Sequence, residues 1–86
     1  MEIVWDEHKR LKNFAKHGFD FLDIVPEFFE EAVVVPAKSG RLMAIGILED
    51  GTIAVVFVTL GREAISVISM RRASRKERSI YEQKAP

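Results

Sequence analysis

The chain has 86 residues, of which 48% are hydrophobic, and its 13 basic and 13 acidic side chains give a net charge of zero. This length and composition predict one folded domain, residues 1–86, and the short apolar runs and acidic N-terminus predict a cytoplasmic protein with no membrane contact. The absence of cysteine excludes a disulfide scaffold, a thiol nucleophile and a thiolate metal site. Because the chain has only two histidines, His8 and His17, we expect no zinc site, and we expect no other metal or cofactor.

The N-terminal residues predict a strand followed by a helix. Residues 2–5 form a short strand, and Asp6 is a suitable N-cap for a helix over residues 7–17. Gly18 follows as the left-handed residue that commonly ends a helix. The helical spacing of apolar residues marks one face for the core, formed by Leu11, Phe14 and Ala15.

A second helix is predicted to begin after Asp20, which can cap it. Its apolar positions follow helical spacing and are Phe21, Val25, Phe28 and Phe29. Pro26 falls inside this pattern, removes a backbone donor and crowds the preceding turn. We therefore expect a kink or a break at Pro26.

The apolar period changes to two after residue 32, which predicts strands joined by short turns. The expected strands are 33–35, 41–49, 53–59 and 64–70, with turns at 38–40, 49–52 and 61–63. The continuously apolar segment 53–59 is expected to be the central strand. Ser74 and Glu77 have the spacing of a capping box that starts a C-terminal helix.

These elements predict an α+β fold. The sheet is expected to be small and mainly antiparallel, with two N-terminal helices and one C-terminal helix packed on one face. The expected core includes Phe14, Val55, Phe57 and Ile68.

Basic side chains are concentrated at the C-terminal end. Residues 71–86 contain only two acidic side chains but six basic ones, namely Arg71, Arg72, Arg75, Lys76, Arg78 and Lys84. In a chain of zero net charge such a cluster indicates a local anion site. A phosphate backbone is the anion that clustered arginines most often bind in small proteins.

The sequence resembles the BrnT family along nearly its whole length. The N-terminal part of the resemblance is the pattern Trp-Asp-x-x-Lys-x-x-x-Asn-x-x-Lys-His-Gly over residues 5–18. The other matching residues are Val4, Glu7, Phe21, Arg41, Gly46, Ile68-Ser69, Arg71-Arg72-Ala73, Glu77-Arg78 and Tyr81.

Membership of this family would imply a RelE-like fold and a ribonuclease toxin of a type II toxin–antitoxin pair, which inhibits translation and growth. The implied partners are RNA and a BrnA-like ribbon-helix-helix antitoxin, with DNA contacted only through the antitoxin in a hetero-oligomer. Two positions depart from the family pattern. Gly40 stands where members commonly carry Glu, and Ser66 where many carry Arg. A non-catalytic toxin remnant that binds nucleic acid or an antitoxin is the alternative, and a structural protein with a basic contact surface is a third reading.

Metal-independent ribonucleases use the 2′-hydroxyl of the substrate as nucleophile, and need a base, an acid and cations around the phosphorane. Arginine suits the cationic role because its planar fork binds phosphate in a bidentate manner and stays charged. The candidate catalytic residues are Arg41, Arg71, Arg72, His17 and Tyr81, and the candidate RNA-binding residues are Lys9, Lys16, Arg75 and Arg78.

Each candidate also has a structural alternative. Arg71 and Arg72 could be solvated or paired with acidic side chains, and Arg41 must emerge on a polar face that need not be catalytic. His17 could instead satisfy the helix C-terminus. The ring of Tyr81 could pack on the sheet, and the lysines could form a solvated helix face. Glu77 is expected to cap its helix.

Overall fold

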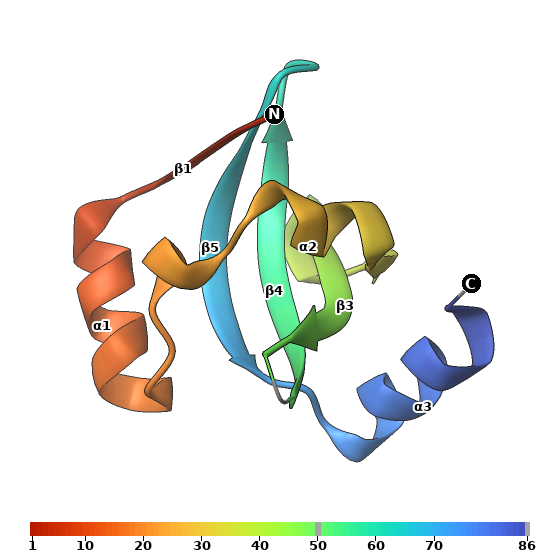
Figure 1. Ribbon diagram of the computed structural model, residues 1–86. Coiled ribbons are helices and arrows are strands. Elements are labelled where there is room, and N and C mark those ends of the chain that lie inside the picture. The colour runs from red at the N-terminus through yellow and green to blue at the C-terminus, as the bar shows by residue number, and fades with distance from the viewer. Residues whose placement is uncertain (50, 86) are drawn as a thin grey trace.

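A five-stranded mixed sheet organises the chain in the computed structural model, which describes residues 1–49 and 51–85. The spatial strand order is β1-β5-β4-β3-β2, so β4 is central as predicted (Figure 1). The bounds are β1 Glu2–Trp5, β2 Val33–Pro36, β3 Leu42–Leu48, β4 Gly51–Leu60 and β5 Ala64–Arg72. Strands β2 to β5 pair with antiparallel neighbours, whereas β1 pairs with β5 in parallel. The turn predicted at residues 49–52 includes Asp50, which lies outside the described residues.

The expectation of a mainly antiparallel sheet with two N-terminal helices is wrong. The sheet is mixed because β1 adds to the outer edge of β5, with Ile3 opposite Ile65. A period-two pattern identifies a strand but carries no information about a partner so distant in sequence. The described residues form three α-helices, one N-terminal, one in the middle and one C-terminal: α1 Glu7–His17, α2 Pro26–Glu31 and α3 Arg75–Lys84.

The predicted second helix is divided at the proline, as the sequence led us to expect. Asp20 accepts a hydrogen bond from the backbone N–H of Leu22 and caps only a short 3₁₀ turn, η1 Phe21–Asp23. The short helix α2 then begins at Pro26, where the missing N–H needs no partner. The chain between β1 and β2 thereby crosses from one edge of the sheet to the other (Figure 1).

The predicted capping residues lie at both ends of α1 and at the start of α3. The carboxylate of Asp6 accepts from the N–H of His8 at 3.0 Å at the start of α1, and Gly18 closes that helix with φ of 77°. Ser74 and Glu77 form the predicted capping box at the start of α3. No helix within residues 1–49 and 51–85 is long and apolar enough to cross a membrane.

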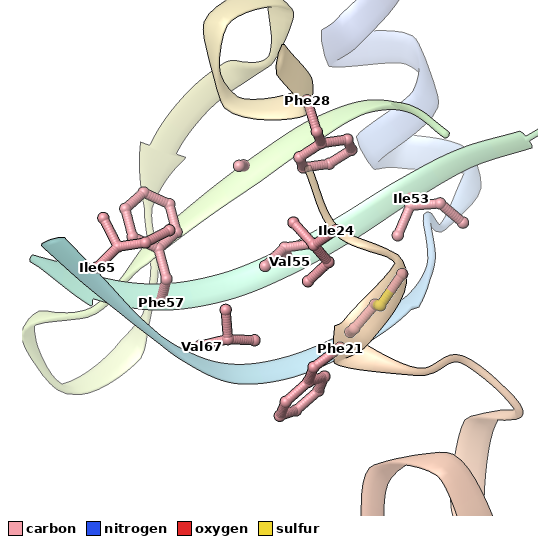
Figure 2. Packing of buried hydrophobic residues seen from close by; sticks show 10 residues of the cluster. Phe21, Ile24, Phe28, Ile53, Val55, Phe57, Ile65 and Val67 are labelled. Carbon is pink, nitrogen blue, oxygen red and sulfur yellow. The ribbon is translucent and has the colours of Figure 1, made fainter. Parts of the chain in front are cut away.

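The core occupies both faces of the sheet, so the helices do not all lie on one face. The larger cluster packs η1 and α2 against the central strands, and Figure 2 shows Phe21 of η1 and Phe28 of α2 in this cluster together with Val55 and Val67. The smaller cluster joins Ile45 and other side chains of the opposite face to Ile80 and Tyr81 of α3.

The predicted core is right for Val55 and Phe57, which are 0% and 5% exposed, whereas Ile68 is only half-buried. It is wrong for Phe14, which is 52% exposed. The inward side of α1 carries Asn13, which is buried and hydrogen-bonds to the β5 backbone. Because α1 lies against the edge of the sheet rather than over its face, polar contacts replace the expected apolar stripe (Figure 1).

Candidate functional site

A β-bulge in β5 interrupts the regular alternation of side chains. Val56 pairs with Ser69, whereas the next residue of β4, Phe57, pairs with Val67. Ile68 is therefore the extra residue of the bulge. As a result Ile68 and Ser69, although adjacent in sequence, both line the same two surface hollows. The bulge thus forms the floor shared by these hollows.

The first hollow lies between α1 and β5 and has a volume of about 540 Å³. Its charged lining comes from α1, where Lys9, Lys12 and Lys16 recur at i, i+3 and i+7 and so share one helical face. His17, in the last turn of α1, lines it too, and Asn13, Ala15, Ile68 and Ser69 complete the wall. This arrangement brings together the predicted residues Lys9, Lys16 and His17.

The second hollow, of about 370 Å³, lies on the other side of the bulge. Its charged side chains are Lys38, Arg41 and Arg71, and the remaining lining residues are Ala37, Met43, Val56, Ile68 and Ser69. Arg41 is exposed and lies immediately before β3, not within a strand as predicted. We call the two hollows together the basic groove. All charged side chains among its described lining residues are cationic.

Arg71 is held in place by Glu77. The guanidinium donates Nη1 to Oε1 at 2.7 Å and Nη2 to Oε2 at 2.9 Å. The same carboxylate accepts the N–H of Ser74 at 2.8 Å, as the predicted cap requires. The Arg71 guanidinium, followed by the Ser74 N–H, lowers the pKa of Glu77 to about 2, and Glu77 in turn raises the pKa of Arg71. This bidentate pair orients Arg71 at the edge of the groove while leaving 32% of its side chain exposed.

Arg72 is not brought together with Arg71, because successive residues of a strand point to opposite faces. Its guanidinium lies 5.7 Å from the ring centroid of Phe19, and it lines a separate hollow with Leu48 and Ile53. Ile53 belongs to the larger core cluster on the face covered by α2.

The predicted residues of α3 also lie apart from the groove lining. The half-buried ring of Tyr81 packs in the smaller core cluster with Ile45, which agrees with its structural alternative. Arg78 donates to the carbonyl of Ala73 at 3.0 Å, and Arg75 is exposed.

A network of charges fixes α1 to the following segment. Arg10 donates to both carboxylate oxygens of Glu7 and of Asp20, at distances of 2.7 to 3.1 Å. Arg10, and secondarily the indole N–H of Trp5, lower the pKa of Glu7 to about 2. The pKa of Asp20 is lowered chiefly by the N–H of Leu22. These bonds hold the helix that carries the groove lysines.

The groove residues that were not among the candidates from the sequence include Lys12, Lys38 and Ser69. Lys12 could have been found because it shares the helical face of Lys9 and Lys16. Ser69 could have been found because it is one of the residues that carry the family resemblance, whereas Lys38 had no signal in the sequence. Within residues 1–49 and 51–85, no group of three His, Asp or Glu side chains is close enough to hold a metal ion.

Comparisons with known proteins agree with the resemblance. Residues 5–77 match the family described as the ribonuclease toxin, BrnT, of type II toxin–antitoxin systems. The chain is also similar to the crystal structure, at 1.1 Å resolution, of the Brucella abortus ribonuclease toxin BrnT, with 56% sequence identity and a TM-score of 0.81. That similarity covers 87% of this chain and 99% of the Brucella chain. No curated protein sequence matches the chain significantly.

Proposed function

Because the chain belongs to the BrnT family of ribonuclease toxins of type II toxin–antitoxin systems, we propose that its basic groove binds RNA and cleaves it without a metal ion. The observation that carries this proposal is the gathering of Lys38, Arg41 and Arg71 around one hollow beside the lysines of α1. Cations fixed on a sheet and a helix can stabilise the charge of a phosphorane without a metal.

The two hollows of the groove have different roles in this proposal, one in RNA binding and the other in cleavage. Lys9, Lys12 and Lys16 bind the RNA backbone along α1, since ammonium groups spaced on one helical face suit successive phosphates. Arg71 and Arg41 hold the non-bridging oxygens of the scissile phosphate. Glu77 keeps the Arg71 guanidinium oriented before the substrate binds. The loss of side-chain entropy when Arg71 contacts the phosphate is therefore smaller.

The reaction is a transesterification within the RNA. The 2′-oxygen loses its proton and bonds to phosphorus, the bond from phosphorus to the 5′-oxygen breaks, and that oxygen takes a proton from solvent water to become a 5′-hydroxyl. His17 lines the groove, and its imidazole accepts the 2′-hydroxyl proton, since imidazole is the side chain that most often serves as a general base in enzymes. The product is a 2′,3′-cyclic phosphate or, after hydrolysis, a 3′-phosphate.

The two adjacent arginines provide the test. Replacing Arg71 by Ala is expected to reduce cleavage of an oligoribonucleotide by about 10²–10³-fold, as for loss of one transition-state donor. Arg72→Ala is the matched control, because Arg72 lies on the opposite face of the sheet, and it is expected to retain cleavage within about threefold. Circular dichroism of each variant separates lost chemistry from lost folding.

Other results would refute parts of the proposal. EDTA is expected to leave the rate unchanged, and RNA with a 2′-deoxy sugar at the cut site is expected to resist cleavage. Abolition by EDTA would exclude the metal-independent mechanism, and equal cleavage of the deoxy substrate would exclude attack by the 2′-oxygen. A folded wild-type protein that binds RNA without cleaving it would favour the non-catalytic remnant.

The antitoxin partner is proposed to be a ribbon-helix-helix protein that covers the basic groove within a hetero-oligomer and supplies all DNA contacts. Family membership supports a partner, the cations of the groove favour an acidic segment, and Leu11 and Phe14, 55% and 52% exposed on α1, offer apolar contact area. Gel filtration of the chain with the product of the neighbouring gene tests this. Failure to co-migrate, or co-migration without inhibition of cleavage, would contradict it.

A further inference from the structure

Asn13 is the one buried polar side chain among the described residues, at 7% exposure. Its amide oxygen accepts the backbone N–H of Met70 at 3.0 Å, and its amide nitrogen donates to the carbonyl of the same residue at 2.8 Å. The nitrogen also donates to the carbonyl of Phe19 at 3.2 Å. One side chain on α1 therefore pairs with β5 through both backbone groups of one residue, as a neighbouring strand would.

This contact lies where β5 lacks a strand on its outer side. The pairing of β1 with β5 ends at Trp5 opposite Val67, and the bulge at Ile68 follows immediately. Without Asn13 the N–H and carbonyl of Met70 would be left without these partners beside the bulge, which destabilises backbone groups that are buried. Asn13 thus restores edge pairing at Met70, two residues after the extra residue Ile68.

The residues on either side of Met70 are the ones that reach the groove. Met70 is fully buried in the larger core cluster, so its side chain anchors one face of the strand. Ser69 and Arg71 flank it and line the groove on the opposite face. Any rotation or slip of the backbone at Met70 would therefore move the Arg71 guanidinium relative to the cations of α1.

We infer that Asn13 is a positioning residue that holds Arg71 in its reactive place by clamping the backbone of Met70. The inference rests on the proposed role of Arg71 in RNA cleavage. Misplacement of a reacting group by about 1 Å can cost about 100-fold in rate, so loss of a backbone clamp one residue away is expected to appear in the chemical step. RNA affinity, supplied largely by the lysines of α1, is expected to change little.

A double-mutant cycle tests this action through Arg71. Single-turnover cleavage of a mixed-sequence oligoribonucleotide is measured for wild type, Asn13→Ala, Arg71→Ala and the double variant, each confirmed as folded by circular dichroism. Asn13→Ala is expected to slow cleavage by about 10–100-fold in the wild-type background but by less than about threefold in the Arg71→Ala background. Leu11→Ala, an exposed change on the same helix, is the control and is expected to match wild type.

The possible results separate this inference from the proposed function. No cleavage by wild type would refute the proposed function, and the inference with it. Equal loss from Asn13→Ala in both backgrounds, or no loss at all, would overturn the inference while leaving the proposed function intact. If Asn13→Ala does not fold, Asn13→Asp takes its place, since it keeps the shape and the acceptor but loses both donated bonds. Failure of both variants to fold would assign Asn13 to stability alone and also overturn the inference.

Discussion

Replacing Glu77 by Gln removes the charge that pairs with Arg71 but preserves the size of the side chain. In the native protein this carboxylate receives two hydrogen bonds from the guanidinium and one from Ser74, and it is only 15% exposed. These partners lower its pKa from 4.5 to about 2.

The expected loss of stability follows from that pKa. Lowering it from 4.5 to about 2 corresponds to about 3 kcal/mol as an upper limit, at about 1.4 kcal/mol per pH unit. Solvent screening reduces this, because Arg71 is 32% exposed, and Gln retains an oxygen that can accept one bond. We therefore expect Glu77→Gln to lower the free energy of unfolding by about 1–3 kcal/mol at pH 7, or the Tm by about 4–24 °C.

The pH dependence of the stability difference tests the role of Glu77 more specifically than the size of that difference at pH 7. Because the folded-state pKa is below the unfolded one, the stabilisation by Glu77 is fully present above pH 4.5 and is lost as the pH falls to about 2. The stability gap between wild type and Glu77→Gln should thus narrow over this interval in melts recorded from pH 7 to pH 2. Glu82→Gln, an exposed change on the same helix, is the matched control. A gap that stays constant with pH, or equals that of the control, would refute the reasoning.

Two further predictions concern the core and the groove. Phe21→Ala should lower the free energy of unfolding, measured in urea, by about 3–5 kcal/mol, since Phe21 is 0% exposed. Phe14 is 52% exposed, so Phe14→Ala should change this free energy by less than about 0.5 kcal/mol. Similar losses for the two variants would contradict the observed packing of α1. Each replacement of Lys9, Lys12 or Lys16 by Ala should weaken binding to a cleavage-resistant oligonucleotide. The slope of log affinity against log salt concentration should become shallower by about 0.7 for each lysine removed. Unchanged slopes would show that the RNA backbone does not contact these lysines.

Local chemistry was predictable wherever short-range interactions decide it. The caps at Asp6, Gly18 and Ser74, the break at Pro26 and the central position of β4 all depend on residues within one or two turns or on a long apolar run. The family was predictable too, because its pattern of tryptophan, lysine, asparagine and arginine residues extends over most of the sequence.

The candidate site was only partly predictable. The sequence indicated Lys9, Lys16, Arg41 and Arg71 as cations for one anion, and the tertiary structure brings them to one groove. It also indicated Arg72, which strand alternation sends to the other face, where it lies over the ring of Phe19. A cluster of arginines in the sequence shows that charge is concentrated along the chain. It does not show on which face of a strand each arginine lies.

The apolar periods and the helix caps could be predicted from the sequence because short windows encode them, and the family could be predicted because its pattern runs along most of the chain. The parallel pairing of β1 with β5, the outward position of Phe14 and the bulge that presents Ile68 and Ser69 together became evident only in the folded chain. Each of these depends on contacts between residues far apart in the chain. The hydrogen bonds between Asn13 and Met70, 57 positions later, are an example. They fix α1 against the outer edge of β5, and no pattern within α1 itself identifies that strand as its partner.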